Sequence, residues 1–549
     1  MKLKFKFMAA AIALMLSTGA AIACTNIIVT KGATTDGSTL VTYSADSHTL
    51  YGELYFSPAS IYGKSAVREV YDWDSGKYIC DIPQVEKTYQ RVGNMNEHQL
   101  IITETTYGGR SELRDPNGKI DYGSLIYITL ERAKNAREAI KTMGELVAEN
   151  GYFSSGESFS IADKDEAWIF EIIGKGEKEK GAVWVAVKIP DGYISAHANQ
   201  ARITTFPLND PENCIYAPDV ISFARQQGYF NGKDADFSFS DTYAPLDFGA
   251  MRGCEARVWS VFNQAGCDVD KYLDYAMGYN AKNRMPLYMK APKKLSPKQV
   301  ADFMRDHYDG TAMDMHTDIG AGGEETPYRW RPMSFESNGK TYLNERAIAT
   351  QQTGWWMMGQ ARNWLPDEIG AVLWFGVDDA ATSCLTPMYV ASTRVPECFR
   401  VGNGNMTQYS PTAAFWMFNR VAQFAYLRYK TLLPEIKKVY DAHENGAMQN
   451  STVVDNKAKE LLAKSKSEAA KFLTEYSIET AQNMFNKWSD LDKYLMVKYI
   501  DGNVKKENEG GFIDNGNKCN IPTMPNFPGY SQKWKDAVAK DTGDKLISK

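Results

Sequence analysis

The stretch CTNIIVTKGATTDGSTLVTYSADS, residues 24–47, carries the strongest structural signal in this chain. β-Branched residues dominate positions 25–30 and 39–42, and Asp36-Gly37 between them is a common turn sequence. The pattern predicts a β-hairpin in which antiparallel pairing places Cys24 opposite residues 45–49. Asp46 is therefore expected within reach of Cys24.

The residues ahead of this hairpin, 1–23, have the composition of a secretory signal peptide. Three lysines precede a short apolar run at 7–16, and Ala21-Ile22-Ala23 fits the small-residue cleavage pattern. That run is shorter than the roughly 20 residues that span a bilayer, and no later stretch is long and apolar enough. We expect export to the periplasm or the cell exterior, no membrane span, and a mature chain that begins with the free α-amine of Cys24.

Cys24 also has two other interpretations. A bacterial lipoprotein begins with an acylated cysteine, which would make this chain a lipid-anchored surface binding protein. The usual leucine three positions earlier is replaced by Ala21, however, and Ile22 stands where a small residue is common. Cys24 could alternatively be an ordinary residue or a disulfide partner, and among the eight cysteines Cys384 and Cys398 form a plausible pair.

Composition and element pattern indicate a large α+β protein. The 549 residues, 44% of them hydrophobic and 23% charged, can bury a large core, and the net charge of -5 gives no sign of nucleic-acid binding. Short strands are predicted at 100–106, 158–162, 167–173 and 183–189, with a helix at 125–150 between them. Long amphipathic helices follow at 413–443 and 453–499. We therefore expect a signal peptide (1–23), a catalytic domain (24–404) and a mainly helical C-terminal region (405–549).

An N-terminal cysteine can supply two of the parts that amide hydrolysis needs, a nucleophile and a base. An α-amine has an ordinary pKa of about 7.7–8.0 and a thiol about 8.5, so the amine can exchange a proton with the sulfur near neutral pH. A histidine base is then unnecessary, which fits a chain with only six histidines and no evident Cys-His arrangement.

Several segments in order resemble the secreted dipeptidase family of N-terminal-nucleophile cysteine peptidases. The resemblance covers about residues 24–400 and rests on the opening stretch together with later segments: MNEHQLIITETT (95–106), GESFSIADKDEAWIFEI (156–172), HANQARI (197–203), MRDHYDGT (304–311), PYRWRP (327–332) and ATQQTGWWMMGQARNWLPDEIGAVLW (349–374). It implies a four-layer αββα N-terminal-nucleophile hydrolase fold and hydrolysis of dipeptides or short peptides through a thioester.

By motif position, the resemblance assigns Cys24 as the nucleophile and Asp46 as the acid that holds its α-amine. A turn or cap residue is the ordinary alternative for Asp46. The alternative activity is that of acylase relatives, which cleave non-peptide amides such as conjugated bile salts or penicillin V. Those relatives have an arginine three residues before the equivalent of Asp46, and Tyr43 stands there in this chain.

The resemblance also implies supporting groups. Asn199 and Asn96 occupy positions of oxyanion donors, since an amide NH2 donates hydrogen bonds without changing its ionisation. Either asparagine could instead be a turn residue. Arg252 or Arg257, in MRGCEARVW, corresponds to an arginine near the nucleophile, and the sequence does not choose between them.

No cofactor or metal is expected, and a homo-oligomer is possible. Imidazole and carboxylate ligands gather in one short segment, but it lacks the H-E-x-x-H spacing, so we interpret it as a solvated loop or a hydrogen-bond network. Another acidic group lacks the continuation of a calcium loop and is interpreted as a turn between strands. The residues concerned are His307, Asp309, Asp314, His316 and Asp318 in the first group, and Asp163, Asp165 and Glu166 in the second.

Overall fold

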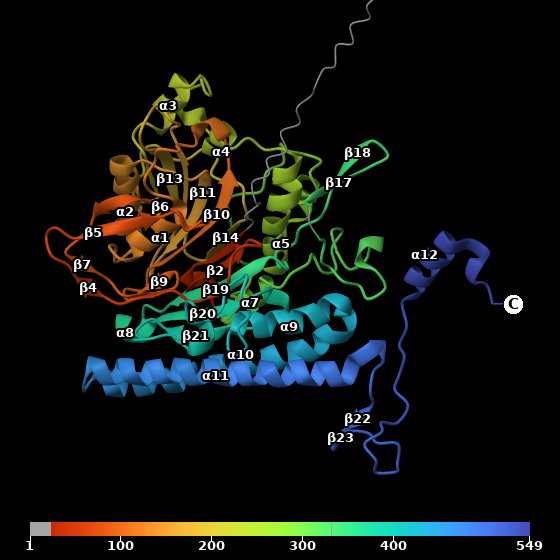
Figure 1. Ribbon diagram of the computed structural model, residues 1–549. Helices are drawn as coiled ribbons and strands as arrows, with labels where there is room; N and C mark the ends of the chain where they lie inside the picture. The colour runs from red at the N-terminus through yellow and green to blue at the C-terminus, as the bar shows by residue number, and fades with distance from the viewer. Residues whose placement is uncertain (1–23, 331, 549) are drawn as a thin grey trace, which may run out of the picture.

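The structure, a computed structural model, describes residues 24–330 and 332–548 (Figure 1). The expected signal peptide at 1–23 lies outside the described residues. In the described part, helices combine with mainly antiparallel sheets, which confirms the α+β class.

The first sheet contains the predicted N-terminal hairpin at its centre. Thr25 pairs with Ser44 and Val29 with Leu40, so the next position of the same register sets Cys24 opposite Ala45, as predicted. A 3-10 turn (Lys31–Ala33) and Gly37 at φ 82° carry the chain between the two strands. The strand order is β16 (Tyr288–Lys290), β14 (Tyr193–His197), β1 (Thr25–Val29), β2 (Thr39–Asp46), β19 (Thr353–Ala361), β20 (Ala371–Val377) and β21 (Thr386–Tyr389).

The second sheet contacts the first one through β1 and β2, which both touch its strand β10. The strands predicted at 100–106, 158–162, 167–173 and 183–189 are confirmed here as β10 to β13, with small differences at their ends. The strand order is β15 (Cys214–Tyr216), β13 (Ala182–Lys188), β12 (Ala167–Gly174), β11 (Gly156–Ala162), β10 (Ile101–Gly108), β9 (Met95–Asn96), β8 (Arg91–Val92) and β3 (Phe56–Ser57).

Four short two-stranded pairs lie outside these sheets. They are β4 (Ser60–Ile61) with β7 (Lys87–Thr88), β5 (Val67–Tyr71) with β6 (Tyr78–Pro83), β17 (Ser334–Ser337) with β18 (Lys340–Leu343), and β22 (Glu507–Asn508) with β23 (Gly511–Phe512).

Helices α1 (Tyr122–Leu130) and α2 (Ala136–Asn150) cover the second sheet (Figure 1). The single helix predicted at 125–150 is therefore two helices. The break occurs because the Asn135 side chain accepts the Glu138 N–H and starts a new helix there. Gly151, at φ 76°, ends α2 as the sequence indicated.

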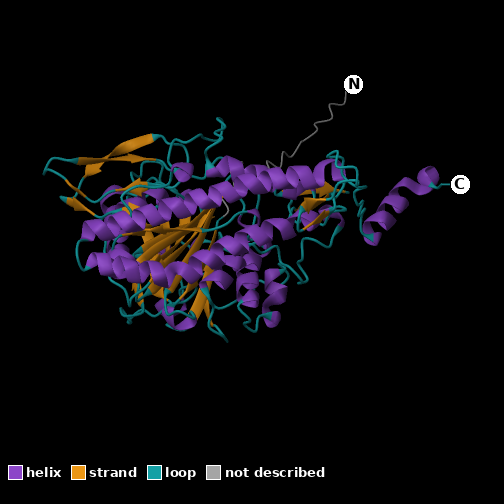
Figure 2. Cartoon of the chain, turned by 90° about the horizontal axis from the view of Figure 1, so that it is seen from below, coloured by secondary structure: helices purple, strands orange, loops and turns teal. Residues whose placement is uncertain are grey.

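The first sheet is covered by helices from both the middle and the end of the chain. Helices α5 (Ala256–Gln264) and α7 (Pro297–Phe303) contact β14 and β2, while α10 (Tyr429–Leu462) and α11 (Lys466–Tyr499) contact β21. The two long helices lie side by side (Figure 2) and α9 (Ala414–Leu427) packs on both. The shorter helices are α3 (Val220–Gln226), α4 (Phe239–Tyr243), α6 (Leu273–Ala276), α8 (Asp367–Gly370) and α12 (Gln532–Thr542).

The cysteines differ from one sequence-based expectation. All eight lie in the described residues and are free, so Cys384 and Cys398 are not a disulfide pair. Both thiols are buried in the hydrophobic core between the first sheet and its covering helices, where they pack as small apolar side chains.

Within the described residues, no helix combines the length and the apolar character that crossing a membrane requires.

Candidate active site

Cys24 is fully buried at the start of β1. Its Sγ lies 3.9 Å from the Tyr43 hydroxyl and 3.7 Å from Glu104 Oε1, so a strand from each sheet contributes a partner. The Asp46 backbone N–H also hydrogen-bonds to the thiol. The hairpin register thus places the sulfur next to Asp46, as the sequence predicted.

Burial raises the pKa of the Cys24 thiol well above its ordinary value, and the charges of Glu104 and Asp46 raise it further. Hydrogen bonds from the Asp46 N–H and Tyr43 lower it only in part. The thiol is therefore protonated near neutral pH in this environment. Nucleophilic attack from this position requires a base that accepts the proton during the reaction.

Asp46 lies at the end of β2, opposite Thr353 of β19, and its carboxylate is buried in a set of donors. Arg346 donates to Oδ2 at 2.5 Å, Ser44 donates to Oδ2 at 3.1 Å, and the Thr353 hydroxyl donates to Oδ1 at 2.7 Å. These contacts fix the carboxylate beside Cys24 as a negative charge. Arg346 and Thr353 were missed in the sequence, because their pairing with Asp46 spans some three hundred positions.

The Arg346–Asp46 pair leads to a stability prediction. Replacing Arg346 with leucine is expected to lower the free energy of unfolding by about 3–5 kcal/mol, because the Asp46 carboxylate stays buried without its charge partner. Urea unfolding at neutral pH measures the change. Lys457→Ala, which breaks an exposed pair with Glu460, serves as the control and should cost less than about 1 kcal/mol. Equal losses in the two variants would contradict the prediction.

Arg257 is the arginine that contacts the nucleophile residue. From α5, its Nη1 donates to the Cys24 carbonyl oxygen at 2.6 Å and to the Thr25 hydroxyl at 2.8 Å. Arg252 instead forms an ion pair with Glu345. The structure therefore resolves the alternative that the sequence left open, in favour of Arg257.

Asn199 lies beside this arginine and lines a cleft. Its Oδ1 accepts from Arg257 Nη2 at 2.9 Å, and its Nδ2 donates to the Thr106 carbonyl at 2.7 Å. The backbone of Asn199 has φ 66°, a left-handed conformation that asparagine tolerates better than most residues. The amide orientation is thus fixed from both ends.

Asn96 does not join this cluster. Its Nδ2 donates to the carbonyl oxygens of Leu130 and Ala133, each at 2.8 Å, where α1 ends. Its Oδ1 accepts from the backbone N–H groups of His98 and Leu100. Both amide protons are committed to main-chain carbonyls, so the assignment of Asn96 as an oxyanion donor is corrected to a structural role.

Tyr43 and Glu104 are functional candidates that sequence reasoning missed. The Tyr43 hydroxyl donates to Glu104 Oε1 at 2.5 Å, and both side chains touch the Cys24 thiol. The position that holds arginine in the acylase relatives therefore holds a neutral donor. A glutamate inside the strand sequence IITET was the available signal, since buried strands rarely contain one without a purpose.

A cleft of about 520 Å³ opens beside the cluster. Ser47, Glu157 and Asn199 line it: Ser47 follows Asp46, Glu157 is joined to Glu104, and Asn199 accepts from Arg257. The cleft therefore reaches the surroundings of the thiol and is the natural place for a substrate.

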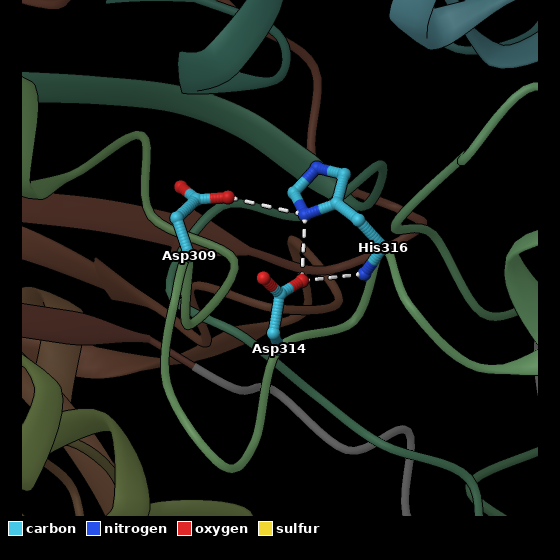
Figure 3. Close-up of side chains that lie close together, drawn as sticks. All are labelled: Asp309, Asp314 and His316. Carbon is cyan, nitrogen blue, oxygen red and sulfur yellow. Dashed lines mark hydrogen bonds and ion pairs between the residues drawn. The ribbon is translucent and has the colours of Figure 1, made fainter.

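The histidine–aspartate segment gathers elsewhere. His316 Nδ1 lies 3.1 Å from Asp309 Oδ1 and 3.0 Å from Asp314 Oδ1 (Figure 3). Asp314 also accepts the backbone N–H groups of His316 and Gly310, so its carboxylate closes the local turn. Asp318 pairs with Arg329 instead. Asp309, Asp314 and His316 thus form a hydrogen-bond network, one of the two alternatives that the sequence left for this segment. Their ligand atoms lie within 4.8 Å of one another, a spacing at which they could also hold a metal ion.

The other acidic group lies between β11 and β12, where Asp163 Oδ1 accepts the N–H groups of Asp165 and Glu166. The predicted turn is confirmed.

Comparisons with known proteins point to one class of enzyme. The family model described as "Peptidase family C69" matches residues 57–442. A "Probable dipeptidase" of Latilactobacillus sakei is 23% identical over 87% of this chain and 95% of its own length. A "Probable dipeptidase" of Salmonella dublin is 25% identical over 70% and 84%, and "Dipeptidase A" of Lactobacillus helveticus is 23% identical over 74% and 82%.

Proposed function

Because this chain belongs to peptidase family C69, we propose that it is a cysteine-type dipeptidase in which Cys24 is the nucleophile. The observation that carries the proposal is the position of Cys24. A buried, protonated thiol stands directly before the first residue of a central strand and is surrounded by fixed polar groups next to a cleft. The proposed product of processing is an exported chain that begins at this residue.

Removal of residues 1–23 changes the chemistry of the Cys24 nitrogen. While a residue precedes Cys24, that nitrogen is a peptide amide, which has no basic lone pair. After cleavage it is a primary amine with an ordinary pKa of about 7.7–8.0. This amine is bonded to Cα, and the sulfur is bonded to the neighbouring Cβ. Processing would thus create the base that the protonated thiol lacks.

The reaction then follows from these groups. The amine takes the thiol proton as Sγ attacks the peptide carbonyl carbon, which forms a C–S bond and an oxyanion. The ammonium gives this proton to the leaving nitrogen as the C–N bond breaks, and a thioester remains on Cys24. Water transfers a proton to the amine and adds its oxygen to the thioester carbonyl. The C–S bond then breaks, the acid product leaves, and the ammonium returns its proton to the sulfur to restore the thiol.

Fixed groups would stabilise the charges that develop. Asn199 lines the cleft, and its Nδ2 together with backbone N–H groups would donate to the oxyanion. Arg257 positions both Asn199 and the Cys24 carbonyl. Asp46 would favour the ammonium that forms when the amine takes the thiol proton.

The fold that we propose for this activity is the four-layer αββα arrangement of N-terminal-nucleophile hydrolases. The two sheets contact each other through β1, β2 and β10, and helices contact each of them. A nucleophile at the start of an inner strand fits that arrangement.

The cleft suits a small zwitterion such as a dipeptide. The cleft lining contains three acidic side chains, those of Asp72, Asp74 and Glu157, and one positively charged side chain, that of Arg114. Arg114 lies over the Phe153 ring at 5.3 Å, its charge lowers the pKa of Asp74, and no ion pair within 4.0 Å joins it to an acid of the described residues. Its guanidinium is therefore available for a substrate carboxylate.

Arg114 gives a direct test of this interpretation. Arg114→Gln is expected to raise KM for dipeptides about tenfold, because a charge-assisted hydrogen bond to the terminal carboxylate is lost. KM for the corresponding dipeptide amides should change little. Arg225→Gln, outside the cleft, is the control. Similar KM increases for acids and amides would contradict the prediction.

A substrate panel and a mass measurement test the proposed function itself. The purified exported protein should hydrolyse dipeptides in preference to conjugated bile salts and penicillin V, whereas the reverse preference would indicate an acylase. The mature protein should have the mass of a chain that begins with unmodified Cys24. A diacylglycerol adduct on that residue would instead indicate a lipid-anchored protein and would refute the mechanism.

A further inference from the structure

Two buried glutamates next to the nucleophile form a site that the reaction described above does not use. Glu104 and Glu157 are 0% and 1% exposed, and a hydrogen bond joins their carboxyl groups. Oε1 of Glu104 accepts from Tyr43, and Oε1 of Glu157 accepts from Thr106 at 2.7 Å. Oε2 of each carboxyl receives no hydrogen bond from any N–H or hydroxyl group of the described residues.

Both carboxyls of the pair have raised pKa values. Burial raises the pKa of both carboxyls, and the charge of Glu104 raises that of Glu157 further. The hydrogen bond from Tyr43 offsets part of this rise in the pKa of Glu104. Within the described residues, neither carboxyl forms an ion pair with a lysine or arginine. A buried charge without a counter-ion is costly, and a bound cation would relieve that cost.

Both positions are close to where the substrate must bind. Glu157 lines the cleft, and Glu104 Oε1 is 3.7 Å from the Cys24 sulfur. The α-nitrogen of a dipeptide lies about 2.5 Å from its peptide carbonyl carbon. Since the sulfur attacks that carbon from about 3–3.5 Å, the substrate nitrogen comes within roughly 6 Å of Sγ. Glu104 lies within this range, and Glu157 is joined to Glu104 and lines the cleft beside it.

We propose that Glu104 and Glu157 together form the subsite for the free α-ammonium group of the substrate, with Glu157 as the wall that contacts it. This inference rests on the proposed function and narrows its substrate class to peptides with an unblocked amino terminus. Its physical basis is that the substrate brings the cation that this buried acidic pair lacks. N-acylated dipeptides lack the cation and are excluded.

Binding measurements test the subsite separately from turnover. The mature Cys24→Ala protein is titrated in a calorimeter with L-alanyl-L-alanine and with N-acetyl-L-alanyl-L-alanine. The free dipeptide should bind at least about tenfold more tightly, as expected for a charge-assisted contact. Equal affinities would overturn the proposal even if the Cys24 protein hydrolyses dipeptides. A Cys24 protein that hydrolyses no dipeptide would refute the proposed function instead.

Glu157→Gln in the Cys24→Ala background then locates the contact. Glutamine keeps the size of the side chain and its hydrogen bond to Glu104, but it cannot share the negative charge. The preference for the free dipeptide should fall to less than about threefold, while affinity for the acetylated peptide stays unchanged. Asp81→Asn, at an exposed acidic position of β6 outside the cleft, is the control and should retain the preference. A similar loss of this preference in the control would show that it depends on the overall negative electrostatic field and not on Glu157. That result would overturn the proposal.

A kinetic measurement shows whether the acidic pair interacts with the α-ammonium group of the substrate or with the α-amine of Cys24. If the pair served the Cys24 α-amine, Glu157→Gln in the Cys24 protein would shift the pH profile of kcat while the KM for free dipeptides stayed at the wild-type value. That outcome would overturn the proposal. The proposal instead requires a higher KM for free dipeptides with little change in the kcat profile. If Glu157→Gln fails to fold, the affinities of the free and the acetylated dipeptide for the Cys24→Ala protein that keeps Glu157 still test the proposal.

Discussion

Replacing Cys24 with alanine is expected to lower kcat/KM for dipeptides at least about 10⁴-fold, because no other group can form the thioester. The variant should fold normally, since alanine occupies less space at a site where the thiol makes only long hydrogen bonds. Hydrolysis of a dipeptide by the purified mature protein measures the loss. Circular dichroism and the thermal midpoint confirm that the variant is folded.

Cys80→Ala is the matched control, because Cys80 is a partly exposed free cysteine on β6, away from the cleft. Its kcat/KM should remain near that of the wild type. If Cys24→Ala retained full activity, the sulfur would not be the nucleophile and the mechanism would be wrong.

A chain that keeps one additional residue ahead of Cys24 is the second variant with a large expected effect. Its kcat should fall about 10²–10⁴-fold, the usual contribution of a general base, because the Cys24 nitrogen is then an amide. The thiol would remain protonated, since burial holds its pKa high. The measurement is dipeptide turnover after mass spectrometry has shown that the extra residue is retained.

The control for this variant restores the amine within the same preparation. A leader with a specific protease site directly before Cys24 allows activity to be measured before and after cleavage, and turnover should appear only after cleavage. Undiminished hydrolysis by the uncleaved protein would show that another group is the base.

The sequence was informative where chemistry depends on neighbours along the chain. The hairpin of residues 24–47 follows from β-branched runs and a turn, and its register brings Asp46 next to Cys24 as predicted. The family resemblance predicted Asn199 and one of two arginines, Arg252 or Arg257, and the structure joins Asn199 to Arg257 by a hydrogen bond. Local pattern and motif order thus sufficed for the nucleophile side of the site.

The other side of the site depends on contacts between distant segments, which no local pattern encodes. Arg346 reaches Asp46, and Glu104 reaches Cys24, only because two sheets and a long loop converge. Asn96 shows the opposite error. Its motif position indicated an oxyanion donor, but the end of α1 uses both of its amide protons.

The long C-terminal helices illustrate a limit of reading composition. The segment around Gly446, rich in asparagine and serine, predicts a break between helices, yet α10 continues through it to Leu462. Ala447 and Val454 are buried there, so packing against the body compensates the poor helix propensity. The break occurs instead at residues 463–465, where Ser465 caps α11.

The hydrogen bonds from Arg257 to Cys24 and Thr25 affect the dynamics of the proposed mature protein. A new chain terminus is ordinarily where a fold frays, because only one neighbour holds it. Here the buried Arg257 guanidinium of α5 donates hydrogen bonds to the Cys24 carbonyl, to the Thr25 hydroxyl and to Asn199. The terminal amine would therefore lie in the rigid interior. Its distance from the sulfur would be set by the covalent geometry of Cys24 and would not vary with motion of the chain terminus.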